Sequence, residues 1–289
     1  MTSLHSKAIR IELLGDGHPD VAGTFSNMAI LLKKQGKYER ALALHEQALA
    51  IEHNVYGRYH TKVGATCHNM AMVLIKCGRF DRALLLSKRA TAIQEKALGY
   101  YHENVAKDYN VMAECLAGLQ RHTEAVASME KCIDIRRSVL QPGDARVGLS
   151  YATMAAMLHA QGKSEASITV HEKALAILLA ARGENHSEVG DAYLNMATVL
   201  ISIPAKFEEA LKCNEQAIAV YTRVFGPHHD GVGDAYYNMA AAVRDRGGQM
   251  PRALNLFYKA REVYSAVYGD GHPEVVEVTE QIRRTLACV

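Results

Sequence analysis

Histidine is the residue whose type and number first suggest chemistry in this sequence. The chain has 14 histidines, and imidazole serves proteins both as a metal ligand and as a general base. One histidine follows a glycine-flanked aspartate in the string GDGHPD at 15–20, and nearly the same string, GDGHPE, returns at 269–274. Such a string could form a metal loop or a phosphate-binding loop. The spacing of the histidines tests both interpretations.

Six of the histidines recur every 42 or 43 residues, or at twice that interval: His18, His60, His102, His186, His229 and His272. That interval places neighbouring imidazoles about one structural unit apart, which is too far for one ion with ligand distances of ~2 Å. The adjacent His228 has no third ligand at a suitable spacing. Where the period skips a histidine, the chain has Asp144, a good helix N-cap residue. We therefore predict helix capping at these positions, with no bound metal and no cofactor.

Two glycine-containing strings resemble nucleotide-binding motifs but lack required residues. AQGKS at 160–164 has Met157 where a phosphate-binding loop needs glycine. GVGDAY at 231–236 lacks a preceding strand and the third glycine of a dinucleotide fingerprint. No Ser/His/Asp or Cys/His arrangement stands out either. We predict that the protein is not an enzyme, and an enzyme with an unrecognised site stays as an alternative.

Composition narrows the classes of partner and the compartment. Lys plus Arg is 33 and Asp plus Glu is 31, so the formal charge is only +2. This balance argues against nucleic acid or a membrane surface as the main partner. The N-terminus has no signal-peptide pattern, and the longest apolar stretch is too short to cross a bilayer. The six cysteines, at 67, 77, 115, 132, 213 and 288, form no C-x-x-C pair and predict free thiols in the cytoplasm.

The recurring string marks an internal repeat that covers nearly the whole sequence. Alignment on it predicts repeats at 15–56, 57–98, 99–140, 141–182, 183–225 and 226–268. Residues 1–14 match the second helix of a preceding repeat. Residues 269–289 contain one terminal helix that we expect to cap the array, with Val275, Val278 and Ile282 as its apolar stripe. We expect the chain to be a segment of a longer protein.

Each repeat has the pattern of two helices joined by a short turn. In the first repeat, PDVAGTFSNMAILLKKQG has apolar residues at helical spacing, and YERALALHEQALAIEHNVY is rich in strong helix formers. The glycine after the second helix suits a left-handed αL conformation. The fifth and sixth repeats have one extra residue, which we place in the turn between the helices.

Three columns of small residues run through the repeats. They are Ala29, Ala71, Ala113, Ala155, Ala197 and Ala240; Ala41, Ala83, Ala125, Ser167, Ala210 and Ala253; and Ala48, Ala90, Cys132, Ala174, Ala217 and Ala260. Small residues at fixed positions on both helices allow their backbones to approach closely. Such a helix pair buries its apolar face only by stacking on its neighbours.

This pattern resembles the tetratricopeptide repeat, in the 42-residue form of kinesin light chains and their relatives. The stretches NMAILLKKQGKYERALALHEQALAI and NMATVLISIPAKFEEALKCNEQAIAV carry the resemblance, together with the GxxHxxV junctions. It implies an all-α fold, a right-handed α-solenoid of antiparallel helix pairs. It also implies that the first helices line a concave groove that binds peptides. The first helices here lack the tryptophan of many such repeats, which the fold tolerates.

One polar column of the first helices could bind a ligand. Asn27, Asn69, Asn195 and Asn238 each precede Met-Ala, although asparagine is only a moderate helix former. The resemblance implies that these asparagines contact bound peptide. The alternative is a buried ladder in which each amide bonds to a neighbouring helix. The column is interrupted at Val111 and Thr153.

Neighbouring positions give the predicted groove its charge. The first two repeats offer Lys34, Lys76 and His68, whereas the fifth and sixth offer Asp191, Asp234 and Tyr237. If these side chains face the groove, it is basic at one end and acidic at the other. We therefore expect a protein or extended peptide of mixed charge as the partner.

The leading functional hypothesis is a non-catalytic scaffold of the kinesin light chain-like adaptor type. A second hypothesis is the ligand-sensing array of a larger receptor that has a nucleotide-binding switch domain. A third, from a different class, is a structural array that self-associates through its open N-terminal edge.

Overall fold

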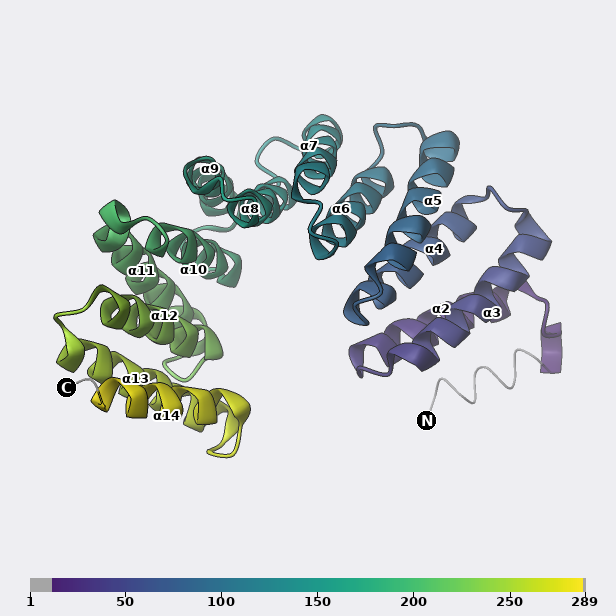
Figure 1. The fold of residues 1–289 in the computed structure, drawn as a ribbon. Helices are drawn as coiled ribbons and strands as arrows, with labels where there is room; N and C mark the ends of the chain where they lie inside the picture. The colour runs from purple at the N-terminus through teal and green to yellow at the C-terminus, as the bar shows by residue number, and fades with distance from the viewer. Residues whose placement is uncertain (1–11, 288–289) are drawn as a thin grey trace. The chain divides into compact units, whose positions relative to one another are not determined.

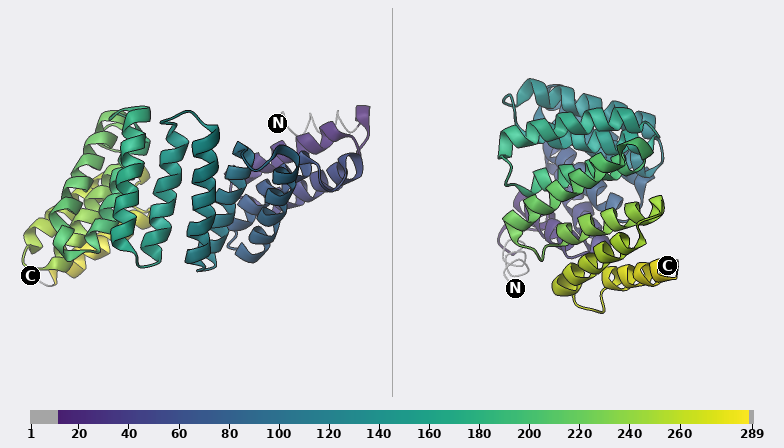
Figure 2. Two further views of the ribbon diagram at one scale, coloured as in Figure 1. Left: turned by 90° about the horizontal axis from the view of Figure 1, so that it is seen from above. Right: turned by 90° about the vertical axis from the view of Figure 1, so that its left-hand side faces the viewer.

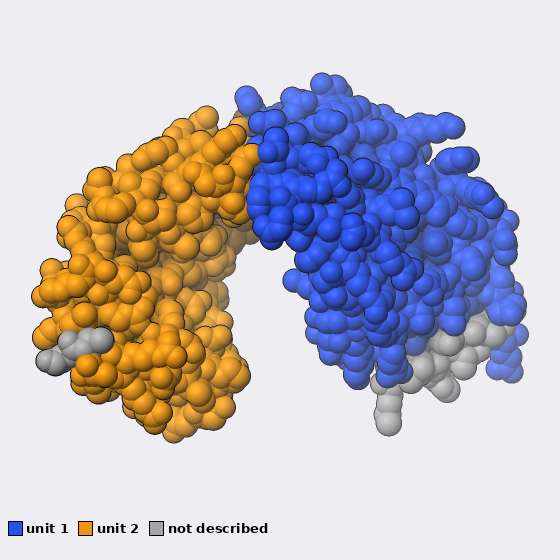
Figure 3. Space-filling model, in the orientation of Figure 1, with its two compact units in different colours: residues 1–141 blue, residues 142–289 orange. Residues whose placement is uncertain are grey.

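The computed structural model describes residues 12–287, and every element in that range is helical. The chain divides into two compact units, residues 1–141 and 142–289 (Figure 3). Unit 1 contains α2 (Pro19–Lys34), α3 (Tyr38–Tyr56), α4 (Thr61–Lys76), α5 (Phe80–Leu98), α6 (Glu103–Gly118) and α7 (His122–Val139). Unit 2 contains α8 (Ala145–Ala160), α9 (Ser164–Arg182), α10 (Ser187–Ile201), η1 (Pro204–Lys206), α11 (Phe207–Phe225), α12 (Asp230–Arg246), α13 (Met250–Tyr268) and α14 (Pro273–Leu286).

The helices pack as successive antiparallel pairs, as Figures 1 and 2 show. In unit 1 the pairs are α2–α3, α4–α5 and α6–α7; in unit 2 they are α8–α9, α10–α11 and α12–α13. The predicted all-α solenoid of helix pairs is confirmed. Each pair falls inside one predicted repeat, while the repeat boundaries themselves stay a prediction.

The terminal helix at the C-terminal end lies within the described residues, whereas most of the predicted leading helix does not. Residues 12–14 are helical, but the rest of the predicted leading helix and its edge lie outside the described residues. At the other end, α14 packs on α13 and buries the predicted stripe of Val275, Val278 and Ile282. On its outer side, Arg284 Nε donates to Glu280 Oε1 at 3.1 Å.

The recurring histidines cap the first helices, as predicted. In each of the six cases, imidazole Nδ1 accepts a hydrogen bond from the backbone N–H two residues later, at 3.1–3.3 Å. Asp144 does the same for α8, where its Oδ1 accepts from Arg146 N at 2.9 Å. Among the described residues, no group of three or more His, Cys, Asp and Glu is placed to hold a metal ion.

Some capping imidazoles also stack on an aromatic ring at the end of the preceding helix. The ring centroids of His229 and Phe225 lie 4.2 Å apart, and those of His272 and Tyr268 also lie 4.2 Å apart. Histidine can therefore join two helices at once, through its nitrogen and through its ring face. A serine or aspartate cap offers only the hydrogen bond.

The glycines at the repeat junctions require a positive φ, but not the αL conformation that the sequence pattern suggested. Gly57, Gly99, Gly183, Gly226 and Gly269 have φ of 76° to 92° and ψ of 158° to 173°. This region is open essentially to glycine alone. The extended ψ carries the chain away from the finished helix toward the histidine cap, whereas αL would fold it back on the last turn.

The turns between paired helices agree with two predictions from the sequence, one for the string AQGKS and one for the extra residue of the fifth repeat. AQGKS spans the end of α8, the turn at Gly162 and the start of α9, so it is an inter-helix turn. The extra residue of the fifth repeat also lies between the paired helices, where η1 precedes α11.

None of the described helices is long and apolar enough to cross a membrane.

The small-residue columns form the centre of each helix pair. All 18 of these residues have no exposed surface. Where serine replaces alanine, Ser167 Oγ donates to the Ala155 carbonyl at 2.7 Å, so the buried hydroxyl is satisfied. The two helices touch at these positions, so only a small side chain fits between them.

Glycines in the first helices of unit 2 make room for tyrosine rings of the second helices. A Cβ on Gly233 would lie 2.5 Å from Tyr264 Cε1, and a Cβ on Gly231 would lie 2.6 Å from Tyr221 Cε2. Both glycines belong to GVGDAY, which lies inside α12. Its glycines therefore serve helix packing rather than phosphate binding.

This packing predicts opposite effects for two Gly→Ala substitutions. Gly233→Ala should destabilise the fold by about 1–3 kcal/mol, because the new methyl group collides with the Tyr264 ring. Gly23→Ala, in α2, meets nothing within 4 Å and should stabilise by up to about 1 kcal/mol through helix propensity. Urea unfolding of both variants measures the difference. Equal effects would contradict the packing argument.

Two buried histidines occupy one position of the second helices. His45 and His171 are each 1% exposed, and the equivalent residue of the third repeat is the fully buried Met129. The Nδ1 atom of both histidines is buried without a hydrogen-bond partner. Burial lowers the pKa of each to about 4, and the positive charge of Lys33 adds to this at His45. Both imidazoles are therefore neutral in the folded state at neutral pH.

We expect these histidines to make the fold acid-sensitive. In the unfolded chain they protonate below about pH 6.5, whereas in the fold they resist protonation until about pH 4. The free energy of unfolding should be highest above pH 6.5, where the histidines are neutral in both states. It should fall between pH 6.5 and 4, by on the order of 3 kcal/mol per histidine. The double variant His45→Met/His171→Met should lose most of this slope in urea unfolding. The exposed-site variant His228→Gln should keep it, and an unchanged slope in the double variant would refute the assignment.

Candidate peptide-binding surface

The first helices lie on the more closely packed side of each unit. In unit 1, α2 contacts α4 and α4 contacts α6; in unit 2, α8 contacts α10 and α10 contacts α12. Among the described residues, no contact of similar extent joins the second helices of successive pairs. Consecutive pairs are therefore closest along their first helices, which form the inner side of each unit.

The four predicted asparagines are available on these first helices. Asn27 and Asn195 are exposed, whereas Asn69 and Asn238 are half-buried. In the described part of the chain, none of their amides forms a hydrogen bond with a neighbouring helix. By contrast, Asn214 of α11 is fully buried and donates to the Ala210 carbonyl at 3.0 Å. The arrangement of the four asparagines thus disfavours the buried-ladder alternative.

His68 pairs with a carboxylate of the next repeat. Its Nδ1 lies 2.6 Å from Asp108 Oδ1, and the side chains are 18% and 2% exposed. Burial raises the pKa of Asp108, and the hydrogen bond with His68 acts in the opposite direction. The pair connects α4 to α6 across two repeats.

A polar pocket of about 220 Å³ lies at this pair. It is lined by Ala65, His68, Asn69, Gln94, Asn104, Lys107 and Asp108. Gln94 and Asp108 are 3% and 2% exposed, and Gln94 Oε1 and Asp108 Oδ2 are buried without hydrogen-bond partners. Buried acceptors without partners are costly. The pocket can therefore accept hydrogen bonds from an N–H or a cationic group of a ligand.

Asp108 is the residue of this pocket that sequence reasoning missed. The equivalent residues of the other repeats are Thr24, Thr66, Ser150, Ala192 and Ala235. A single acidic residue in a column of small, uncharged residues was the available signal. Its meaning depended on knowing that the position is buried.

The lysines of unit 1 lie near a carboxylate. Lys34 and Lys76 are exposed. The pKa of the neighbouring Lys33 is lowered, first by burial and then by the charges of Lys76 and Lys34. Burial raises the pKa of Glu114 of α6, against the hydrogen bond from Asn110 and the charge of Lys76. The inner side of unit 1 thus carries both signs of charge, although lysine predominates at these helix ends.

The predicted aspartates of unit 2 are each held by a tyrosine of the paired helix. Asp191 Oδ1 accepts from the Tyr221 hydroxyl at 2.5 Å, and Asp234 Oδ1 accepts from the Tyr264 hydroxyl at 2.7 Å. Partial desolvation raises the pKa of Asp234, and the bond from Tyr264 opposes this. The tyrosine that packs on glycine therefore also orients the adjacent carboxylate.

Tyr237 has a packing role. It is half-buried, and its ring meets that of Phe257 edge-on, with centroids 5.6 Å apart. Burial raises the pKa of its hydroxyl. Only part of this side chain is available to a ligand.

Comparison with known families identifies the repeat. The family model described as tetratricopeptide repeat matches residues 2–52, 62–138 and 205–266, and a second model with the same description matches residues 147–188. No curated protein matches this chain.

Solved structures show the same fold. One, from Podosopora anserina and described as kinesin light chain nearly identical TPR-like repeats, has a TM-score of 0.62 at 22% identity and covers 72% of this chain and 98% of its own. BtubC (BKLC) from P. vanneervenii has a TM-score of 0.66 at 18% identity, covering 78% and 88%.

A Rap protein complexed with Competence and Sporulation Factor has a TM-score of 0.62 at 11% identity, covering 92% of this chain and 75% of its own. At these identities the likeness shows the fold alone. The family models match most of the sequence, so this chain belongs to the tetratricopeptide repeat family.

Proposed function

We propose that this chain is a non-catalytic scaffold that binds an extended peptide segment of a partner protein along its first helices. The observation that carries the proposal is the set of four asparagines whose amides form no hydrogen bonds with other residues that the structure describes. An asparagine amide can donate to a peptide carbonyl and accept from a peptide N–H. This suits the backbone of an extended peptide, whose polar groups need partners when it binds.

The charges on the inner sides favour a ligand with groups of both signs. In unit 1, Lys34 and Lys76 suit a carboxylate of the ligand, and the pocket beside Asn69 suits an N–H donor. In unit 2, Asp191 and Asp234 suit a cationic side chain. Tyr221 and Tyr264 hold these two carboxylates in place, so little conformational entropy is lost when they bind.

The structural neighbours support a binding role for such an array. One neighbour was solved in complex with Competence and Sporulation Factor, and another is described as kinesin light chain repeats. An adaptor of the kinesin light chain-like type is the form of scaffold that we favour. The cytoplasm is the location that we propose for it, in line with its free buried cysteines.

The decisive variant is Asn195→Ala combined with Asn238→Ala. A ligand peptide is first selected by peptide display on the whole chain, and its affinity is then measured by calorimetry. We expect the double variant to lose about 1–3 kcal/mol of binding free energy, because two amide contacts disappear. The urea unfolding curve should stay nearly unchanged, because neither amide forms a hydrogen bond with another residue in the described range 12–287.

The matched control is Asn214→Ala, which removes a buried amide from α11. It should lower stability, because the fold loses the hydrogen bond to the Ala210 carbonyl, and it should leave peptide affinity unchanged. If instead the Asn195/Asn238 variant loses stability and keeps its affinity, the asparagines serve the fold and the proposal fails.

A further inference from the structure

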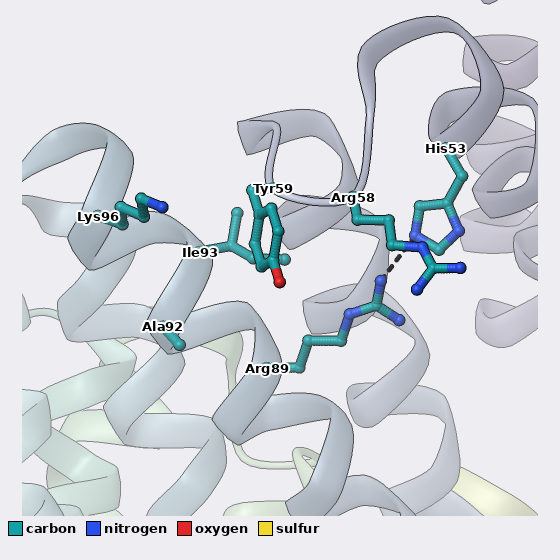
Figure 4. Close-up of a pocket in the computed structure, with 7 residues that line it drawn as sticks. All are labelled: His53, Arg58, Tyr59, Arg89, Ala92, Ile93 and Lys96. Atoms are coloured by element: carbon teal, nitrogen blue, oxygen red, sulfur yellow. Dashed lines mark hydrogen bonds between the residues drawn. The ribbon is translucent and has the colours of Figure 1, made fainter.

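A cationic crevice lies between the second helices of the first two repeats, α3 and α5. It has a volume of about 580 Å³ (Figure 4). Its polar lining consists of His53, Arg58, Arg89 and Lys96, and Tyr59 and Ile93 form apolar walls. None of the described residues that line it has a carboxylate. None of these residues belongs to the first-helix surface described above.

The positive groups of this crevice are spread around an aromatic ring. Arg89 Nη2 donates to His53 Nε2 at 2.7 Å, which holds the guanidinium at one side of the crevice. On the other side, Lys96 Nζ lies 5.2 Å from the centroid of the Tyr59 ring. Figure 4 shows Tyr59 between Lys96 and the two arginines. The side chain of Tyr59 is 70% exposed, so a ligand can reach it.

The pKa of His53 reflects both its burial and the surrounding positive charge. Its pKa is lowered by burial first, and then by the charges of Arg89 and Arg58. The imidazole that accepts the hydrogen bond from Arg89 is neutral, so it brings no negative charge to offset that of the guanidinium. The crevice thus has three permanent cations and no lining counter-charge.

The corresponding crevice in unit 2 separates the effect of repeat stacking from the effect of these residues. It lies between α11 and α13, and its volume is about 680 Å³. At equivalent positions it has Pro227 for Arg58, Lys259 for Arg89 and Glu262 for Ala92. A crevice of this kind therefore occurs at one junction between stacked repeats in each unit. The unbalanced positive lining belongs to the first two repeats.

We propose that this cationic crevice binds the phosphate monoester of a phosphorylated side chain on a protein partner. A phosphate monoester carries about −1.5 to −2 charges at pH 7 and has three acceptor oxygens, which suits several converging cations. Arginine guanidinium groups match phosphate geometry through paired N–H donors. The walls formed by Tyr59 and Ile93 suit the organic group that bears the ester.

Two other anions fit less well. A single carboxylate needs only one arginine, which leaves the remaining cations unpaired. Free phosphate has no organic group to contact Tyr59 and Ile93. The proposal does not rest on the peptide-binding function of the first helices, because it concerns other residues on the second helices.

The test uses the whole chain and small probes at constant ionic strength, because salt screens exposed charges. The probes are N-acetyl phosphotyrosine amide, N-acetyl phosphoserine amide, N-acetyl tyrosine amide and inorganic phosphate. Amide chemical-shift titrations by NMR give affinities and show which residues respond. We expect both phosphorylated probes to bind at residues 53–59 and 89–96, with the unphosphorylated tyrosine probe inactive.

The critical variant is Ala92→Glu, which places a carboxylate among the cations. Because unit 2 has Glu262 at the equivalent position, the fold accommodates this side chain. We expect affinity for the phosphorylated probes to fall about tenfold or more, with an unchanged melting temperature. Arg89→Gln should also weaken binding. The matched control, Lys259→Gln in the unit 2 crevice, should bind as the wild type does.

Three results would overturn the proposal. The first is the absence of any phosphate binding up to about 10 mM, which is weaker than a specific contact would give. The second is equal affinity of the wild type and Ala92→Glu. The third is inorganic phosphate binding as tightly as the esters, which would identify free phosphate as the ligand instead of a phosphorylated side chain.

Discussion

Close contact between paired helices is the constraint on which the rest of this structure depends. At three positions of every repeat, a residue no larger than serine or cysteine is buried with no exposed surface. These positions set how near the two helices come and how each is rotated about its axis. A larger residue at any of them would push the pair apart, and the loss would pass to the neighbouring repeat of the same unit, because successive pairs within a unit pack on each other. The helix faces that are not buried in these contacts are the ones that solvent and ligands can reach.

Within each unit, the junctions between repeats fix the direction in which one helix pair follows the last. A glycine with positive φ and extended ψ ends one helix, and a histidine nitrogen caps the next. In three junctions the imidazole also stacks on the aromatic residue before that glycine, as His60 does on Tyr56. Cap and stack together resist rotation of the first helix about its start. This resistance keeps an asparagine near the middle of that helix on the same side in successive repeats.

Departures from the repeat pattern create the local chemistry. Most repeats have a small or uncharged residue where unit 1 has Asp108, and that carboxylate produces a polar pocket with His68. Likewise, a crevice lies between second helices in both units; of these two, as far as the described residues show, the one beside Arg89 is lined by cations without carboxylates. A repeat protein can thus vary single residues on a constant framework, and each variation changes the local charge and hydrogen-bonding groups with little change to the fold.

The sequence by itself determined the features that repeat or act locally. The period predicted the helix pairs, the small columns predicted the buried contacts, and the histidines and Asp144 predicted the caps, because each depends on residues close in sequence or on a pattern repeated many times. Only the tertiary structure decided which side chains from different helices meet. His68 with Asp108, Tyr221 with Asp191, and Arg89 with His53 are separated by 30 to 40 residues. Their contacts depend on which side chains of one helix meet those of another in the folded chain, and the residues around each partner do not identify the other partner.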